Sequence, residues 1–247
     1  MLISLTLLGI LLLAVLVHGY ATPGAQLFGR VYSKGPSGGM TVALTFDDGP
    51  NDPHTSRVLD ILRTSGNLKA TFFTTGKNVQ DFPETAKRIL NEGHVLGNHS
   101  FSHNANHAVI PGGYRDIGRA QTAIFETLGV LPHLYRPPHG KKSPWEHRYL
   151  KDHGLVAINW SAATGELGKK SPEVVARRLL GKVRPGAIIL LHDGYGNEHG
   201  NRHADKSLTV HVLPMVIRAL QAQGYKFATV PELLGIPAYG TGIPKQG

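Results

Sequence analysis

The sequence predicts one α/β domain in which about seven parallel strands close into a barrel covered by helices. Three observations lead to this fold class. Short β-rich runs alternate with helical patterns from Met40 onward, no linker interrupts the alternation, and a chain of 247 residues suits a single domain of barrel size. Because the chain has no cysteine, disulfides and thiolate metal sites are excluded, and any metal ion must bind through histidine and carboxylate side chains.

The N-terminal segment is distinct from the rest of the chain. The run from Met1 to Val17 is apolar almost throughout, and no charged residue occurs before Arg30. Its length lies between that of a signal-peptide core and that of a membrane-spanning helix of about 20 residues. We therefore expect residues 1–24 to be a signal peptide or membrane anchor, and the globular part to be extracytoplasmic, membrane-anchored or secreted. A buried core helix would normally show a polar face, which this run lacks.

Domain boundaries follow from composition. Residues 25–39 contain Gly and Pro without a periodic apolar pattern and are expected to form a tether, and residues 40–237 form the domain. The tail at residues 238–247 is expected to be unpacked, because it is short, terminal and rich in Gly.

Strands and helices are expected to alternate along the domain. The expected strands are TVALTF (41–46), KATFFTTG (69–76), HVLGNH (94–99), HLYR (133–136), LVAINW (155–160), GAIILLHD (186–193) and YKFATV (225–230). The expected helices are RVLDILRTSG (57–66), ETAKRILNEG (84–93), residues 114–128, WEHRYLKDHG (145–154), PEVVARRLLGK (172–182) and residues 208–223. Repeated βα units of this kind predict a parallel sheet.

Polar side chains stand where the expected strands end. They are Asp47 and Asp48, His99, Arg136, Trp160, and His192 with Asp193. In a parallel barrel the carboxyl ends of the strands lie on one face, where the loops assemble active sites. The sequence therefore predicts that these residues converge on one pocket.

A metal site is expected among them. His99 and His103 are four residues apart in HSFSH and would point the same way from one turn of helix. With Asp48 they form a His2Asp set that leaves coordination positions open for water and substrate. This set suits zinc and also cobalt, nickel or another divalent ion. Taken alone, an HxxxH pair is more often incidental than a pair of ligands.

The adjacent carboxylates of the stretch ALTFDDGP fit the same interpretation. A divalent cation would neutralise Asp48, and Asp47 would remain ionised as a base for the metal-bound water, whose pKa falls from about 15.7 towards about 7. The alternative is a turn that caps a helix, because Asp, Gly and Pro all favour turns. The histidines favour the metal site.

Four motifs in order resemble those of the polysaccharide deacetylase family. TFDDGP, HSFSH, RPPHG (136–140) and ILLHD (189–193) are similar to the motifs of the NodB-homology domain, also called carbohydrate esterase family 4. LKATFFTTG is similar to the second strand of that domain, so the resemblance covers about residues 40–234. It implies a distorted (β/α) barrel of NodB-homology type and metal-dependent removal of acetyl groups from N-acetylated sugars.

The resemblance also implies catalytic roles. Asp47 corresponds to the catalytic base, Arg136 to the residue that orients it, and His192 to the general acid that protonates the leaving amine. The metal ligands that it implies are Asp48, His99 and His103. A histidine suits the acid role because its pKa near 6.5 allows both protonation states near neutrality.

On the substrate side the resemblance implies four contact residues. Leu190 lines the pocket for the acetyl methyl group, and the backbone N–H of His139 stabilises the oxyanion. Pro138 and Trp160 complete the set. His139 stands where the family more often has an aromatic residue.

One motif departs from the family pattern. Where the family usually has an Asp-Trp pair that tunes the catalytic histidine, NWSAATGEL offers Glu166 and Leu167. Glu166 is therefore a candidate for tuning His192, with a longer side chain. The polar loop that follows His192 contains His199 and His203, which we expect at a solvent-facing rim; a second metal site there is the less favoured alternative.

We expect a metal-dependent hydrolase that removes N-acetyl groups from GlcNAc-type residues of an extracytoplasmic polysaccharide, with peptidoglycan favoured over chitin or chitooligosaccharides. The formal charge of +9 favours anionic surroundings such as acidic lipid or cell-wall polymer, and membrane association through the N-terminal segment fits them. The sequence shows no interleaving of aromatic and basic residues, so we do not expect nucleic acid as a partner. The alternatives are a catalytically impaired carbohydrate-binding protein and an amidase for a small nitrogenous substrate.

Overall fold

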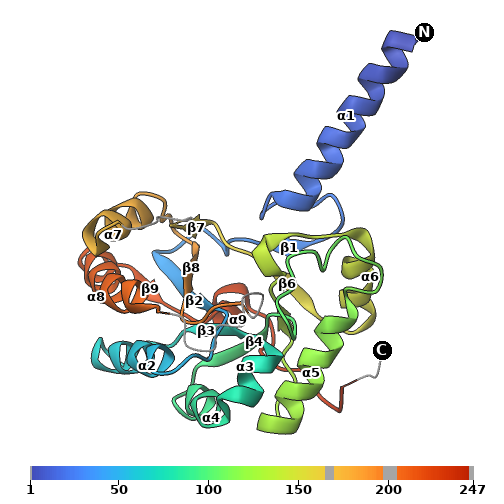
Figure 1. Cartoon of the computed structure of the whole chain (residues 1–247). Coiled ribbons are helices and arrows are strands. Elements are labelled where there is room, and N and C mark those ends of the chain that lie inside the picture. The colour runs from blue at the N-terminus through green and yellow to red at the C-terminus, as the bar shows by residue number, and fades with distance from the viewer. Residues whose placement is uncertain (1, 165–169, 197–204, 245–247) are drawn as a thin grey trace.

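The computed structural model describes residues 2–164, 170–196 and 205–244. It contains an α/β domain from which one long helix projects (Figure 1). The strands are β1 (Val31–Tyr32), β2 (Thr41–Asp47), β3 (Thr71–Thr74), β4 (Val95–Asn98), β5 (Leu134–Tyr135), β6 (Val156–Ile158), β7 (Ala162–Ala163), β8 (Ile188–His192) and β9 (Lys226–Phe227). The helices are α1 (Leu2–Ala21), α2 (His54–Thr64), α3 (Gly76–Asp81), α4 (Pro83–Asn91), α5 (Arg115–Leu128), α6 (Pro144–Asp152), α7 (Pro172–Leu180), α8 (Ser207–Ala222) and α9 (Val230–Leu234), with a short 3-10 helix η1 (Pro138–Gly140).

The described strands form one parallel sheet in the order β1-β6-β5-β4-β3-β2-β8-β7, with β9 paired to β2. The path begins at β1 and ends at β7, so within the described residues the sheet curls into a distorted, partly open barrel. Parallel strands joined through helices explain why helices such as α2 and α8 pack against the sheet. The prediction of one parallel α/β barrel-like domain is confirmed.

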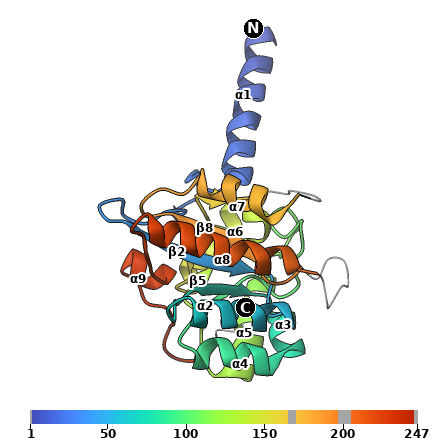
Figure 2. The same cartoon turned by 90° about the vertical axis from the view of Figure 1, so that its left-hand side faces the viewer.

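The core is built around β2. In this strand every residue after Thr41 is buried, which matches its apolar sequence. Phe46 belongs to the same buried cluster as Val58 and Leu62 of α2 and Leu213 of α8. Figure 2 shows α8 crossing in front of the strands. Each such side chain contributes about 1.5–3 kcal/mol on burial, so this cluster fixes the position of β2 and of the residues that follow it.

The chain before β2 is part of the domain. Val31 and Tyr32 pair with Ala157 and Ile158 of β6, and Val31 is buried. The expected tether over residues 25–39 is therefore wrong at β1. A strand of two residues carries no alternation of apolar and polar positions, so its sequence gives no periodic signal.

The start of the C-terminal tail is also packed. The backbone N–H of His133 donates to the carbonyl of Ala238, and Gly240 donates to the carbonyl of Leu131. The Tyr239 hydroxyl accepts a hydrogen bond from the Leu96 N–H at 3.0 Å. The expectation of an unpacked tail is wrong at Ala238–Gly240, because backbone hydrogen bonds and a single aromatic ring hold this segment.

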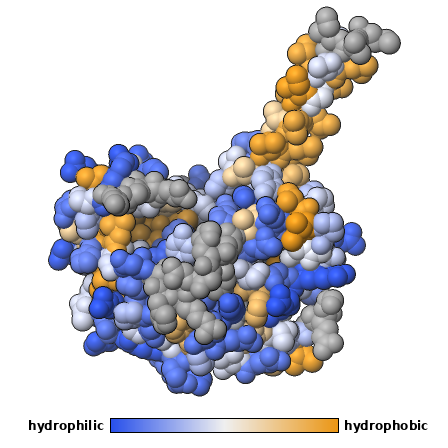
Figure 3. Space-filling model, in the orientation of Figure 1, coloured by the Kyte–Doolittle hydropathy of each residue, from blue (hydrophilic) through white to orange (hydrophobic). Residues whose placement is uncertain are grey.

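α1 is exposed from Ser4 to His18, and the face visible in Figure 3 is mainly apolar. Residues 4–21 are long and apolar enough to cross a membrane by length and composition. The helix ends on the domain beside α6, where the backbone N–H of Lys142 donates to the carbonyl of Tyr20. The Lys142 ammonium donates to the carbonyl of Thr22 at 2.5 Å.

Candidate metal centre and active site

Strand pairing gathers the predicted residues at one edge of the sheet. Asp47 at the end of β2 lies opposite His192 at the end of β8. β4 and β5 are paired at their last residues, so His99 and Arg136, which follow directly, emerge at the same edge. The convergence expected at the carboxyl ends of the strands is what the structure has.

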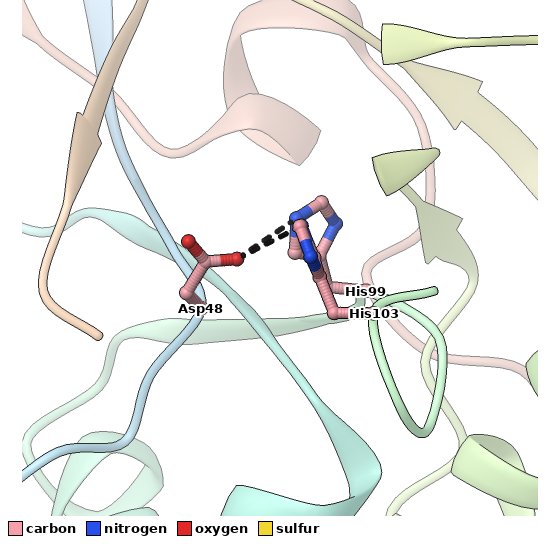
Figure 4. Close-up of side chains that lie close together, drawn as sticks. All are labelled: Asp48, His99 and His103. Atoms are coloured by element: carbon pink, nitrogen blue, oxygen red, sulfur yellow. Dashed lines mark ion pairs between the residues drawn. The ribbon is translucent and has the colours of Figure 1, made fainter. Parts of the chain in front are cut away.

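Three buried side chains meet at one point of this edge. Asp48 Oδ1 lies 3.3 Å from His99 Nε2 and 3.2 Å from His103 Nε2. Figure 4 shows the carboxylate and the two imidazoles reaching towards each other from different segments. All three ligand atoms lie within 4.8 Å of one another. They form a group able to hold a metal ion.

The chemistry of this group fits a divalent cation. Ligand atoms bound at about 2.0–2.1 Å to a tetrahedral zinc ion stand about 3.3 Å apart, close to the separations between Asp48 Oδ1 and the two imidazoles. Asp48 Oδ1 is buried, and no hydrogen bond from the described part of the chain satisfies it. A buried carboxylate oxygen in this state is costly without a cation.

The segment that supplies the two histidines is a loop. Ser100 and His103 have φ of 63° and 55°, in the left-handed region, so the expected helical turn at HSFSH is wrong. Each such non-glycine residue costs about 1–2 kcal/mol. Side chains of the loop hold it in place, because Asn98 Oδ1 accepts from the Ser100 N–H at 2.8 Å and Ser100 Oγ accepts from the His103 N–H at 3.0 Å.

Arg136 holds the second carboxylate of the pair. Its Nη1 donates to Asp47 Oδ1 at 2.6 Å and to Thr45 Oγ1 at 2.8 Å, and the guanidinium lies 3.9 Å from the ring centroid of Phe73. Arg136 is fully buried, so the ion pair acts in a low-dielectric environment. Asp47 Oδ2 is 3.7 Å from His99 Nε2, which places the carboxylate beside the metal ligands without joining them.

The electrostatics of the cluster favour a cation. Burial raises the pKa of Asp48, but His103, His99 and His192 outweigh it and hold the pKa well below the usual range. Burial lowers the pKa of His103 to about 3, so its imidazole is neutral, as a metal ligand must be. Burial also opposes a proton on His99, yet Asp47 and Asp48 raise its pKa. Carboxylates that draw a proton to this point also draw a metal ion.

His192 and Asp193 lie at the end of β8, next to Asp47 and Asp48 at the end of β2. Burial lowers the pKa of His192, and the charges of Asp48 and Asp47 act in the opposite direction. Burial raises the pKa of Asp193 to about 7, and its Oδ2 accepts a hydrogen bond from Thr55 Oγ1 at 2.6 Å. Burial outweighs the two carboxylates, so the pKa of His192 lies below its usual value and a neutral imidazole is favoured.

The residues predicted as substrate contacts lie at the same carboxyl edge of the sheet. Leu190 lies two residues before His192 in β8, so both side chains point to one face of the sheet. η1 carries Pro138 and His139, and the ring centroids of His139 and His103 are 4.8 Å apart. Trp160 lies 5.7 Å, ring centroid to guanidinium carbon, from Arg136. Their roles towards a substrate stay predictions.

Four predicted residues fall outside the described part of the chain: Glu166, Leu167, His199 and His203. Sequence reasoning missed Thr45 and Asn159, which accept hydrogen bonds from Arg136 through a hydroxyl and a backbone carbonyl. Thr45 had a signal, because it is a polar residue inside an apolar strand. Asn159 had none, because its carbonyl is the acceptor.

A family model described as Polysaccharide deacetylase matches residues 34–158, half of the chain. The chain belongs to this family. Among curated relatives it is similar to a peptidoglycan-N-acetylglucosamine deacetylase of Bacillus cereus, with 35% identity over 218 residues that cover 87% of this chain and 76% of the relative. It is also similar to a chitooligosaccharide deacetylase of Bradyrhizobium, with 36% identity over 205 residues, 80% of this chain and 92% of the relative.

Solved structures give the same picture of the polysaccharide deacetylase fold. A crystallised peptidoglycan N-acetylglucosamine deacetylase has a TM-score of 0.75 and 31% identity, covering 90% of this chain and 96% of the other. A family 4 pseudoenzyme from Bacillus anthracis has a TM-score of 0.73 and 27% identity, covering 83% and 68%. Since the fold occurs with and without activity, the function must be argued from the site.

Proposed function

We propose that this polysaccharide deacetylase removes N-acetyl groups from GlcNAc residues of peptidoglycan outside the cytoplasm. One observation carries the proposal: a buried His2Asp group stands directly beside a second carboxylate held by Arg136, and His192 is the register partner of that carboxylate's residue. Amide hydrolysis needs an activated water, a stabilised oxyanion and a protonated leaving nitrogen, and these residues can supply all three.

Asp48, His99 and His103 would hold the cation. A bound divalent ion would polarise the acetyl carbonyl and acidify the attacking water. Asp47 is the group that takes the proton from this water. Arg136 keeps Asp47 in one orientation and balances its charge, because the 2.6 Å bond to Oδ1 leaves Oδ2 on the side of His99.

The other residues act on the acetyl group and the leaving amine. His192 delivers a proton to the departing nitrogen, and Leu190 receives the acetyl methyl group. The backbone N–H of His139 donates to the carbonyl oxygen as negative charge develops there. Pro138 and Trp160 shape the wall next to this oxygen. Glu166 is the candidate for tuning His192.

Zinc is the proposed metal, with cobalt, nickel and other divalent ions as alternatives that the same ligands accept. The preference for peptidoglycan is supported by relatives from Bacillus cereus and Listeria monocytogenes that carry this substrate in their names. The Bradyrhizobium relative favours chitooligosaccharides as the second candidate. The motifs specify the acetamide group, and they do not specify the polymer that carries it.

The proposed location is extracytoplasmic, with α1 as membrane anchor or export signal. The apolar, exposed helix and the formal charge of +9 support a position at an anionic cell surface. Fractionation of cells that express the full chain tests this. The proposal expects the protein in the membrane or outside the cell, and a cytosolic pool with an intact N-terminus would refute export.

The decisive experiment measures acetate release by the full chain in detergent micelles on peptidoglycan and on chitooligosaccharides. The metal-loaded protein is compared with protein stripped by EDTA and with stripped protein reloaded with zinc. Release that disappears on stripping and returns on reloading supports the deacetylase, and the ratio of the two rates ranks the substrates. No release from either glycan with stoichiometric bound metal would contradict the proposal and favour a carbohydrate-binding protein.

A further inference from the structure

A buried chain of polar groups lies behind η1, outside the four motifs. The Tyr135 hydroxyl donates to Glu146 Oε1 at 2.5 Å, and His107 Nδ1 lies 3.4 Å from the same oxygen. On the other side of the ring, His107 Nε2 lies 3.3 Å from the carbonyl oxygen of Pro138. This series of polar groups thus links β5 and α6, through the His107 imidazole, to the backbone of η1.

All three side chains are withdrawn from solvent. Glu146 and His107 are each 2% exposed, and Tyr135 is fully buried. Glu146 Oε2 is buried and has no hydrogen-bond partner within the described residues. Apolar side chains of similar volume would fill this space without such a desolvation cost. A carboxylate and an imidazole kept here need an explanation beyond packing.

The Pro138–His139 peptide, at which this series of polar groups ends, supplies that explanation. The carbonyl of Pro138 and the N–H of His139 belong to a single planar peptide group, in which they point in opposite directions. A donor that fixes the carbonyl therefore fixes the direction of the N–H. A hydrogen bond to the carbonyl also polarises the peptide and makes its N–H a stronger donor.

The backbone conformation of His139 also requires a contact that holds the Pro138–His139 peptide in place. His139 has φ of 56°, a left-handed conformation that a non-glycine residue keeps only when its surroundings impose it. The His107 ring faces an oxygen on each side, Glu146 Oε1 beside Nδ1 and the Pro138 carbonyl beside Nε2.

We propose that His107 and Glu146 are positioning residues that orient and polarise the Pro138–His139 peptide, so that the His139 N–H points at the oxyanion. The inference rests on the proposed deacetylase activity, in which this N–H meets the acetyl oxygen. It gives two residues outside the family motifs a defined part in the reaction, although neither touches the substrate.

The first test replaces His107 by Phe in the full chain, which keeps a ring and removes the donor. Removing one oxyanion donor costs about 10²–10³ in kcat in other enzymes, and we expect a loss of about ten- to a hundredfold from misdirecting it. KM for chitooligosaccharide and zinc content should stay close to those of the wild type, whereas the melting temperature should fall because the buried Glu146 carboxylate loses its imidazole neighbour. His211→Phe, on an exposed histidine of α8, is the matched control and should leave kcat unchanged.

Two further variants separate positioning from packing. His107→Gln retains an N–H donor and should recover part of the lost kcat. Glu146→Gln keeps the shape but weakens the hold on His107, so we expect a smaller loss than in His107→Phe. Its control is Glu126→Gln, at an exposed position of α5. If His107→Phe fails to fold, Glu146→Gln alone decides, and unchanged kcat in that variant overturns the proposal.

Crystal structures of the wild type and His107→Phe keep this test independent of turnover. The proposal expects the Pro138–His139 peptide to rotate or become disordered in the variant. An unchanged peptide orientation, or a loss of activity that follows lost zinc or raised KM, would overturn it. A wild-type chain that releases no acetate would instead refute the proposed function, while the peptide orientation would still decide the role of His107.

Discussion

The two ends of β4 carry buried histidines with opposite behaviour. His94 precedes the strand and His99 follows it, and they are 4% and 2% exposed. Burial acts on both in the same direction. At the amino end it lowers the pKa of His94 to about 4, whereas at the carboxyl end Asp47 and Asp48 overcome it and raise the pKa of His99.

The difference shows what turns a buried histidine into a functional one. His94 Nδ1 accepts a hydrogen bond from the Ala70 N–H at 3.2 Å, so a neutral ring serves the packing of the sheet. His99 faces two carboxylates and stands where the strands of a parallel sheet present their loops. The same residue type serves packing at one end of the strand, and at the other end it belongs to a group that could hold a metal ion because of the carboxylates around it.

The largest expected effect comes from removing the charges at the carboxyl end. Asp48→Ala should lose the metal and the activity together, because two imidazoles alone bind a divalent ion weakly. Asp47→Asn should keep the metal and lose about 10²–10⁴ in kcat, the usual contribution of a general base. Metal analysis and acetate release on the same samples check both. Full metal retention by Asp48→Ala would disprove the ligand assignment.

Next in size is the loss of the buried ion pair. Arg136→Met leaves Asp47 as an uncompensated buried charge and should lower the free energy of unfolding by about 3–5 kcal/mol. Urea denaturation followed by tryptophan fluorescence measures it. The double variant Arg136→Met, Asp47→Asn should recover part of this stability; a purely additive loss would contradict the pairing.

At the amino end of β4, we expect His94 to have a smaller effect on the free energy of unfolding, one that depends on pH. The unfolded chain protonates His94 near pH 6.5, and the folded protein does so only near 4. The stability from this neutral ring is therefore fully present above about pH 6.5 and is lost as the pH falls towards 4, by up to about 3 kcal/mol. Denaturation of wild type and His94→Gln across this range measures it. Equal slopes for the two proteins would refute the assignment.

The smallest effect concerns the loop that supplies the ligands. Ser100→Ala removes the acceptor of the His103 N–H and should cost about 1 kcal/mol of stability. Since outer partners of metal ligands usually contribute at least tenfold to affinity, we expect zinc to bind about ten times more weakly. Competition with a zinc chelator checks this. The control variant Ser207→Ala, at the half-buried first residue of α8, should leave zinc affinity unchanged.

Most of the residues that gather at the carboxyl ends of the strands could be predicted from the sequence. Asp47, Asp48, His99, Arg136 and His192 could be placed together because each follows an apolar run, and parallel strands bring such positions to one edge. This placement depends on the periodicity of apolar residues and on the direction of the chain, and both follow directly from the order of the residues. The sequence also predicted the parallel sheet.

What it missed depends on conformation or on backbone atoms. The HSFSH loop leaves the helical region at Ser100 and His103, and residue spacing alone does not reveal positive φ. β1 has two residues, and Ala238–Gly240 is held mainly by backbone hydrogen bonds, so neither shows periodicity. His107 and Glu146 meet only through the tertiary fold.

The central claim is that Asp48, His99 and His103 bind a divalent cation, and anomalous diffraction at the zinc edge tests it most directly. Crystals of the full chain grown with zinc should give one strong peak about 2 Å from Asp48 Oδ1 and from the two Nε2 atoms. Crystals of His94→Gln should give the same peak, and those of Asp48→Ala should lose it. A peak at other residues, or none beside Asp48 with zinc bound in solution, would contradict the account.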